Sequence, residues 1–159
     1  EASFSDGQKL LAFNDFFVGP RIPISARYWI EFEDRREKQS SSGVLVSTGA
    51  GSTGWMSSVF NMVNGVENYH THSSHHIDHP LKWESRILEF VVREPFLSRT
   101  TSVDICFGEI GEKEKLHIES DMPENGIVFS DGVVSDAIRF STGMSVDIGI
   151  ANEMAKLVV

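Results

Sequence analysis

Hydrophobic and polar residues alternate along several short stretches of the sequence. From Ile24 to Phe32 every second residue is apolar, and the residues between them are mostly polar or charged. A period of two places successive side chains on opposite faces of a strand, so this stretch predicts a half-buried strand. Residues 88–92 and 103–107 alternate in the same way, with Glu89 on the polar face of the first stretch.

Further short strands are expected over residues 115–120, 126–130, 137–140, 145–151 and 155–159. Glycine, Asn-Gly and Asp-Gly turn signals lie between them. Many short strands at regular spacing are typical of a β-sandwich. The sequence therefore predicts a mostly β, sandwich-like fold for a single domain over residues 1–159, with one main helix.

That helix is indicated by a different period. Apolar residues recur at spacings of three and four over residues 55–63, with serine and asparagine between them. We expect a helix over about residues 53–64, capped by Ser52 or Thr53 and closed by Asn64-Gly65, because a glycine often follows a last turn. Its apolar stripe is expected to pack against the body of the domain.

The turn before this helix is rich in glycine. Residues 43–55 read Gly-Val-Leu-Val-Ser-Thr-Gly-Ala-Gly-Ser-Thr-Gly-Trp, an apolar strand that leads through the turn into the helix. Gly49, Gly51 and Gly54 permit the backbone to approach a ligand closely or to adopt positive φ. A helix N-terminus here would offer N–H groups and a positive dipole end to a phosphate or carboxylate. A ligand site and a purely structural turn both fit this pattern.

Composition and charge narrow the class of protein. The 159 residues carry a formal net charge of -9, which disfavours nonspecific nucleic-acid binding because that requires a basic face. The single cysteine, Cys106, excludes an internal disulfide and is expected in the core. No run of about 18 apolar residues is present, so no membrane partner is expected. Without a signal peptide at the start, the expected location is cytoplasmic.

Two polar stretches carry further candidate chemistry. The mixed charges of residues 31–38 predict a solvated hairpin end. Histidines gather at positions 70, 72, 75, 76 and 79, and imidazoles at this density bind zinc, nickel or copper. No cysteine or second histidine cluster completes a ligand set, so we expect an exposed loop and no metal site. The alternative is a loop that borders a ligand site, in which one imidazole contacts a phosphate group of the ligand.

Several motifs follow one another along the chain: Ala12-Phe13-Asn14-Asp15, Ser25-Ala26-Arg27-Tyr28, the stretch from Gln39 through the glycine-rich turn, Arg93-Glu94-Pro95-Phe96 and Ser130-Asp131-Gly132. Together they resemble the carboxy-terminal domain of the NAD kinase family, in the divergent branch that includes the mitochondrial enzymes. In that family an Asn-Glu or Asn-Asp pair precedes a stretch close to Asp-Gly-(three apolar)-Ser-Thr-Pro-Thr-Gly-Ser-Thr-Ala-Tyr. Here Ser42 replaces the usual aspartate, Gly49-Ala50 replace Pro-Thr, and Gly54-Trp55 replace Ala-Tyr.

The resemblance implies a function and a set of contact residues. It implies the acceptor-binding domain of an enzyme that transfers a phosphoryl group from ATP, with Mg²⁺, to the 2′-hydroxyl of NAD and so makes NADP. The positions that match the family's dinucleotide contacts are Asn14, Asp15, Thr53, Gly54, Trp55 and Ser58, and those of the phosphate-adjacent loop are Gly49, Gly51 and Ser52. An Asn amide can donate to and accept from a base or ribose, and an Asp carboxylate can accept from ribose hydroxyls.

The family's catalytic motif is missing from this sequence. Gly-Gly-Asp-Gly binds the donor and carries the catalytic aspartate in the family's amino-terminal α/β domain, and the sequence does not contain it. We therefore expect that domain to precede Glu1 in the complete protein, and no catalytic residue and no kinase activity in this chain alone. Two alternatives stay open: a kinase of the wider superfamily that acts on a sugar, lipid or other diol, and a non-catalytic nucleotide-binding or assembly module. The family likeness also implies a homo-oligomer.

Overall fold

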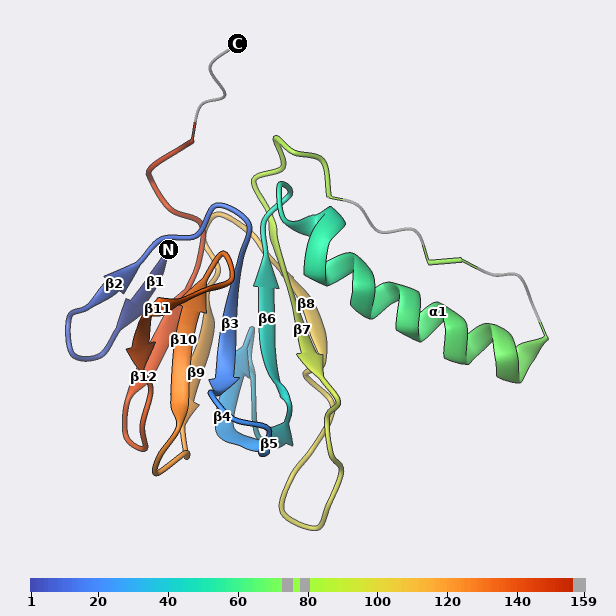
Figure 1. Cartoon of the computed structure of the whole chain (residues 1–159), viewed down its shortest axis with the longest axis horizontal. Coiled ribbons are helices and arrows are strands. Elements are labelled where there is room, and N and C mark those ends of the chain that lie inside the picture. The colour runs from blue at the N-terminus through green and yellow to red at the C-terminus, as the bar shows by residue number, and fades with distance from the viewer. Residues whose placement is uncertain (73–75, 78–80, 156–159) are drawn as a thin grey trace.

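Two antiparallel sheets of six strands each form the body of the protein in this computed structural model (Figure 1), which describes residues 1–72, 76–77 and 81–155. The first sheet contains, in spatial order, β2 (Lys9–Leu10), β1 (Ala2–Phe4), β12 (Ser145–Ile148), β9 (Leu116–Ser120), β4 (Ala26–Phe32) and β5 (Arg35–Ser41). The second contains β11 (Val133–Arg139), β10 (Gly126–Ser130), β3 (Asp15–Pro20), β6 (Gly43–Ser47), β7 (Leu88–Arg93) and β8 (Phe107–Ile110). The mostly β, sandwich-like fold predicted from the sequence is confirmed.

The hydrophobic core lies between the inner faces of the two sheets. Tyr28 and Ile30 of β4 and Phe16 and Val18 of β3 belong to one buried cluster that joins the sheets. The residues between them on β4 are more exposed, as a period of two requires. The predicted strands at 24–32, 88–92, 115–120 and 126–130 correspond to β4, β7, β9 and β10.

The helical segment follows β6 and lies beside the second sheet. A short helical turn, η1 (Ser52–Met56), leads directly into α1 (Ser57–Thr71). Met56 is fully buried, but α1 then runs away from the sheets (Figure 1), and Met62 and Val66 are 52% and 57% exposed. The prediction that the apolar stripe packs against the domain is therefore wrong for the middle and end of the helix.

The start of the helix differs from the sequence prediction. Gly51 occupies the N-cap position of η1, and no side chain there makes a capping hydrogen bond. Ser52 Oγ instead donates to Gly49 O at 2.8 Å. Gly54 interrupts the helical geometry, with φ −93° and ψ −118°. The predicted cap by Ser52 or Thr53 is therefore wrong, because the chain bends sharply before the regular helix begins.

The end of the helix also differs. The helix continues through Asn64-Gly65 as far as Thr71, and His72 follows in the left-handed conformation with φ 51°. Asn64 is buried and holds the later segment: its Oδ1 accepts from Ile77 N–H at 2.8 Å, and its Nδ2 donates to Ile77 O at 3.1 Å. The asparagine thus anchors a neighbouring segment and does not end the helix.

Tertiary contacts also overturn part of the strand assignment. Residues 103–106 are not a strand, because Ile105 N–H donates to the Glu37 carboxylate at 2.9 Å, and β8 begins only at Phe107. Cys106 is half-buried, although it was expected in the core. Glu37 itself is buried in the stretch predicted to be solvated. Glu89 is fully buried on what was predicted to be a polar face.

The carboxyl end of the chain has less regular structure than predicted. Strand β12 stops at Ile148, and residue 155 belongs to no strand. The remainder of the predicted strand 155–159 lies outside the described residues, as do His75 and His79 of the histidine segment. Among the described residues, no helix has the length and apolar character needed to cross a membrane.

Candidate functional site

Three loops meet around a hollow of about 390 Å³ at one end of the second sheet. They are the start of β3 at Asn14-Asp15, the glycine-rich turn after β6, and the Asp131-Gly132 turn that joins β10 to β11. Strand β3 pairs with β6 on one side and with β10 on the other. The antiparallel pairing therefore brings together residues that are far apart in the sequence.

Close backbone packing holds the glycine-rich turn against the start of β3. Thr48 N–H donates to Asn14 O at 2.9 Å, and Gly51 N–H donates to Thr48 Oγ1 at 3.2 Å. A Cβ on Gly51 would lie 2.2 Å from Asn14 O. Only glycine fits at this position without moving the backbone that carries Asn14.

The side chains of Asn14 and Asp15 are the half-buried polar side chains of the hollow. Both are half-buried, and neither side chain has a hydrogen-bond partner within the described residues. Burial, and then the nearby charge of Asp131, raise the pKa of Asp15 above its usual value. A ligand that supplied hydroxyl or amide donors would satisfy these groups and stabilise the ionised form of Asp15.

The charge of the hollow restricts the kind of ligand group that it can hold. Asp15 and Asp131 are its two charged lining residues, and its described lining contains no lysine or arginine. Two carboxylates repel a phosphate and attract hydroxyl, amide or cationic groups. The hollow therefore suits the hydroxyl-bearing or base portion of a ligand better than its phosphates.

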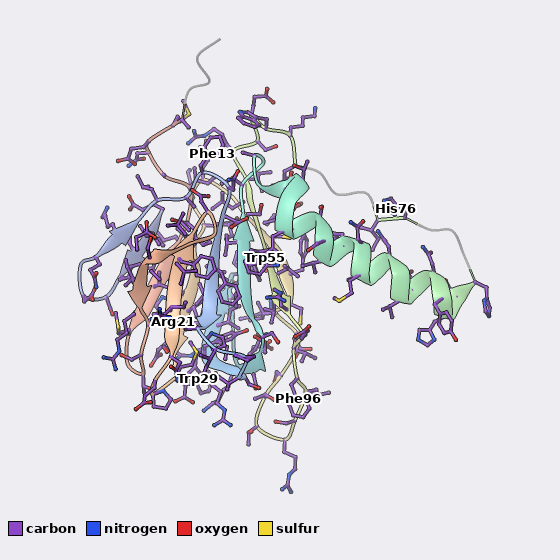
Figure 2. The ribbon with its side chains drawn as sticks, viewed as in Figure 1. Phe13, Arg21, Trp29, Trp55, His76 and Phe96 are labelled. Carbon is purple, nitrogen blue, oxygen red and sulfur yellow. The ribbon has the colours of Figure 1, made fainter. Side chains whose placement is uncertain are left out.

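Trp55 forms one rim of the hollow, where η1 meets α1 (Figure 2). Its ring stacks on Phe17, with centroids 5.3 Å apart and an interplanar angle of 13°. The Arg93 guanidinium lies 5.0 Å from the Trp55 ring centroid. These contacts stabilise the orientation of the indole at the rim.

The structure brings most of the sequence-predicted site residues together. Thr53 and Gly54 line the hollow beside Asn14 and Asp15. Ser58 lies outside it, in an apolar groove of about 470 Å³ between α1 and β7, and its Oγ donates to Trp55 O at 2.7 Å.

Gly49 and Ser52 also lie outside the hollow and hold the shape of the turn. A Cβ on Gly49 would lie 2.1 Å from Lys82 O. The Ser52 hydroxyl is buried and lies within hydrogen-bonding distance of Gly49 O and Leu81 O. The Gly54 N–H donates to Gly51 O at 2.9 Å, so this amide is already paired.

Three residues of the hollow, Ala50, Asp131 and Gly132, were not assigned to the site from the sequence, and Asp131 is the charged one. Asp131 follows strand β10 and has φ 52°, and Gly132 after it has φ 73°. The Asp-Gly pair gave a turn signal, but nothing local indicated that this turn would lie beside Asn14, more than a hundred residues earlier. The pairing of β10 with β3 supplies that proximity.

No group of three His, Cys, Asp or Glu side chains within the described parts of the chain is arranged to hold a metal ion. In the hollow, both oxygens of the Asp131 carboxylate accept backbone N–H groups. Asp131 thus uses part of its hydrogen-bonding capacity on the backbone of the protein itself.

The sequence matches no protein-family model and no curated protein. The fold is similar to that of an NAD kinase from Archaeoglobus fulgidus whose structure was determined in complex with ATP. The TM-score is 0.61 and the sequence identity is 18%, over 95% of this chain and 50% of that chain. The chain thus spans half the length of this neighbour and shares its fold over that half.

Proposed function

We propose that this chain is the acceptor-binding part of an NAD kinase-like enzyme. In this proposal, the hollow beside the glycine-rich turn holds the ribose and base of NAD, the acceptor. The observation that carries the proposal is the pair of half-buried residues, Asn14 and Asp15, which line a hollow whose two carboxylates disfavour a phosphate. The similarity of the fold to an NAD kinase supports the same assignment.

The proposed chemistry follows from the groups that line the hollow. The Asp15 carboxylate accepts from ribose hydroxyls, and the Asn14 amide donates to and accepts from the base or the sugar. Trp55 and the Gly51–Gly54 backbone define the shape of the rim. Transfer also needs ATP, Mg²⁺ and a base, which we assign to the part of the enzyme that carries a Gly-Gly-Asp-Gly motif. With ATP and Mg²⁺ added, the chain alone should form no NADP.

Calorimetric titration of NAD into the 159-residue chain tests the proposal. Asp15→Asn removes a charged hydrogen bond to the ligand and should weaken binding about ten- to a hundredfold. Asp136→Asn is the matched control, because Asp136 is exposed on β11 and outside the hollow. Inorganic pyrophosphate should not compete with NAD at this site. Equal NAD affinity in the wild type and Asp15→Asn would reject Asp15 as a ligand.

A second acceptor class fits the same hollow. The oxygens of Asn14 and Asp15 can accept hydrogen bonds from the hydroxyl groups of any compact diol, and no lysine or arginine in the described lining selects for a charged ligand. A sugar or another polyol would therefore also satisfy these two side chains. A competition panel of NAD, ADP-ribose, free ribose and inositol separates these acceptors by affinity. Binding of none of them would favour a non-catalytic module.

A further inference from the structure

The Asp131 carboxylate is surrounded by the backbone that carries the proposed acceptor-binding side chains. Its Oδ2 accepts from Phe13 N–H at 2.9 Å. Its Oδ1 accepts from Asn14 N–H at 2.6 Å and from Asp15 N–H at 3.2 Å. Consecutive N–H groups that converge in this way form a concave anion site, called a nest. Here an internal carboxylate fills the nest.

The position of Asp131 is itself fixed by the second sheet. Its own N–H donates to Asp15 O at 2.9 Å, so the two segments bind each other in both directions. Ser130, the residue before it, lies opposite Phe16 in the pairing of β10 with β3. The two left-handed residues Asp131 and Gly132 then turn the chain into β11. A rigid hairpin thus presents the carboxylate to the start of β3.

The opposite side of the same segment is held by Thr48. Its Oγ1 donates to Phe13 O at 2.7 Å, and its N–H donates to Asn14 O at 2.9 Å. Asp131 therefore binds the N–H groups of this segment, and Thr48 binds its carbonyl groups. With the backbone held on both sides, the side chains of Asn14 and Asp15 remain to face the hollow.

We propose that Asp131 is a positioning residue for the acceptor site, whose carboxylate fixes the backbone of residues 13–15 and so aims Asn14 and Asp15 at the acceptor. This inference rests on the proposed function for the identity of the ligand. Asp131 acts through the backbone, because its two oxygens accept the N–H groups of Phe13, Asn14 and Asp15.

Two substitutions separate the carboxylate from the turn that carries it. Asp131→Gly removes the carboxylate and leaves a residue that adopts positive φ without strain, so the hairpin should still fold. Asp131→Asn keeps the shape and tolerates the left-handed conformation, but it removes the charge. Asp6→Asn is the control, because Asp6 also accepts a backbone N–H, from Gln8 at 3.1 Å, in an exposed turn outside the hollow.

Three measurements on the 159-residue chain test the proposal. In Asp131→Gly, amide hydrogen exchange at residues 13–15 should accelerate, and NAD affinity should fall about ten- to a hundredfold. Sodium formate, a small carboxylate that can enter the emptied nest, should slow that exchange and restore part of the affinity. Asp131→Asn should fall between the wild type and Asp131→Gly, and Asp6→Asn should match the wild type with or without formate.

The outcomes separate this proposal from the proposed function. Unchanged exchange at residues 13–15 in Asp131→Gly overturns the positioning role. Lost affinity with unchanged exchange and no response to formate also overturns it, because that result indicates direct contact between Asp131 and the acceptor. If the wild type binds no NAD, the proposed function fails, and hydrogen exchange with formate rescue alone decides the role of Asp131.

Discussion

Replacing Gly51 with alanine should disrupt both the stability and the site of this protein. Gly51 has φ −82° and ψ −13°, a conformation that alanine adopts without strain. The added methyl group, however, would lie 2.2 Å from Asn14 O and 2.6 Å from Asn14 C. Both are backbone atoms, so no side-chain rotation can relieve the overlap. The effect is therefore steric and acts directly on the segment that carries Asn14 and Asp15.

The size of the effect follows from the distances. Ordinary contact begins at 3.4 Å, so the turn and the start of β3 must separate by about 1.2 Å. The Gly51 N–H to Thr48 Oγ1 hydrogen bond, already 3.2 Å long, would then be lost. Overpacking typically costs about 1–3 kcal/mol and a hydrogen bond about 1 kcal/mol. We expect the free energy of unfolding to fall by about 2–4 kcal/mol.

Urea unfolding of Gly51→Ala, followed by tryptophan fluorescence, measures this change. Gly65→Ala is the matched control, because Gly65 lies inside α1 and a Cβ there would meet nothing within 4 Å. Alanine should raise stability at that position by about 0.5–1 kcal/mol, since glycine disfavours the helix. If Gly51→Ala unfolds within about 0.5 kcal/mol of the wild type, the steric reasoning is refuted.

Three further predictions concern other parts of the molecule. Because burial and Asp131 raise the folded-state pKa of Asp15 above its ordinary value of 3.8, the native state loses stability as pH rises from that value through the folded pKa. Asp15→Asn should lack this loss. Urea unfolding across a pH series should show that the free energy of unfolding of Asp15→Asn, relative to that of the wild type, increases between pH 3.8 and the folded-state pKa and is constant at higher pH. Tyr28→Phe should lower the free energy of unfolding by about 1–3 kcal/mol, because the buried hydroxyl lies 3.0 Å from Gln39 Oε1 and 2.7 Å from Ser41 Oγ. Tyr69→Phe, at a side chain 77% exposed, should leave unfolding unchanged, and equal effects of the two substitutions would contradict the reasoning. Sedimentation should give a mass above that of one chain at micromolar concentration, because edge strand β11 exposes Val133 and Val134 to 45% and 44%. A single-chain mass throughout a dilution series would exclude this self-association.

Features that depend on near neighbours in the sequence could be predicted from it. The alternation from Ile24 to Phe32 was sufficient to place β4, because a strand with one buried face has an apolar residue at every second position. The period of residues 55–63 located the helix, although it did not locate its ends. The glycines of the turn after β6 could be recognised as permitting close backbone approach, but the contact that requires Gly51 could not. That contact is with the carbonyl group of Asn14, which only the folded chain brings near.

Features that depend on distant segments were decided by the tertiary structure. A polar residue in an alternating strand predicts an exposed face, yet Glu89 is fully buried in the folded protein. The stretch 103–106 has the period of a strand, but Ile105 N–H donates to the Glu37 carboxylate, and the regular pairing with β7 begins at Phe107. In both cases the local pattern shows which residues are polar, but it does not show which distant segments will contact them in the folded protein.

The candidate site also combines features that the sequence determined with features that only the tertiary structure decided. The sequence by itself determined that Asn14, Asp15 and the glycine-rich turn carry suitable chemistry, because side-chain type and backbone freedom are properties of single residues. Only the tertiary structure placed Asp131 against the backbone of residues 13–15, where it holds the segment that the ligand would meet. The physical reason is that strand pairing sets such contacts: β3 lies between β6 and β10, and the pairing register brings together loops that no local pattern connects.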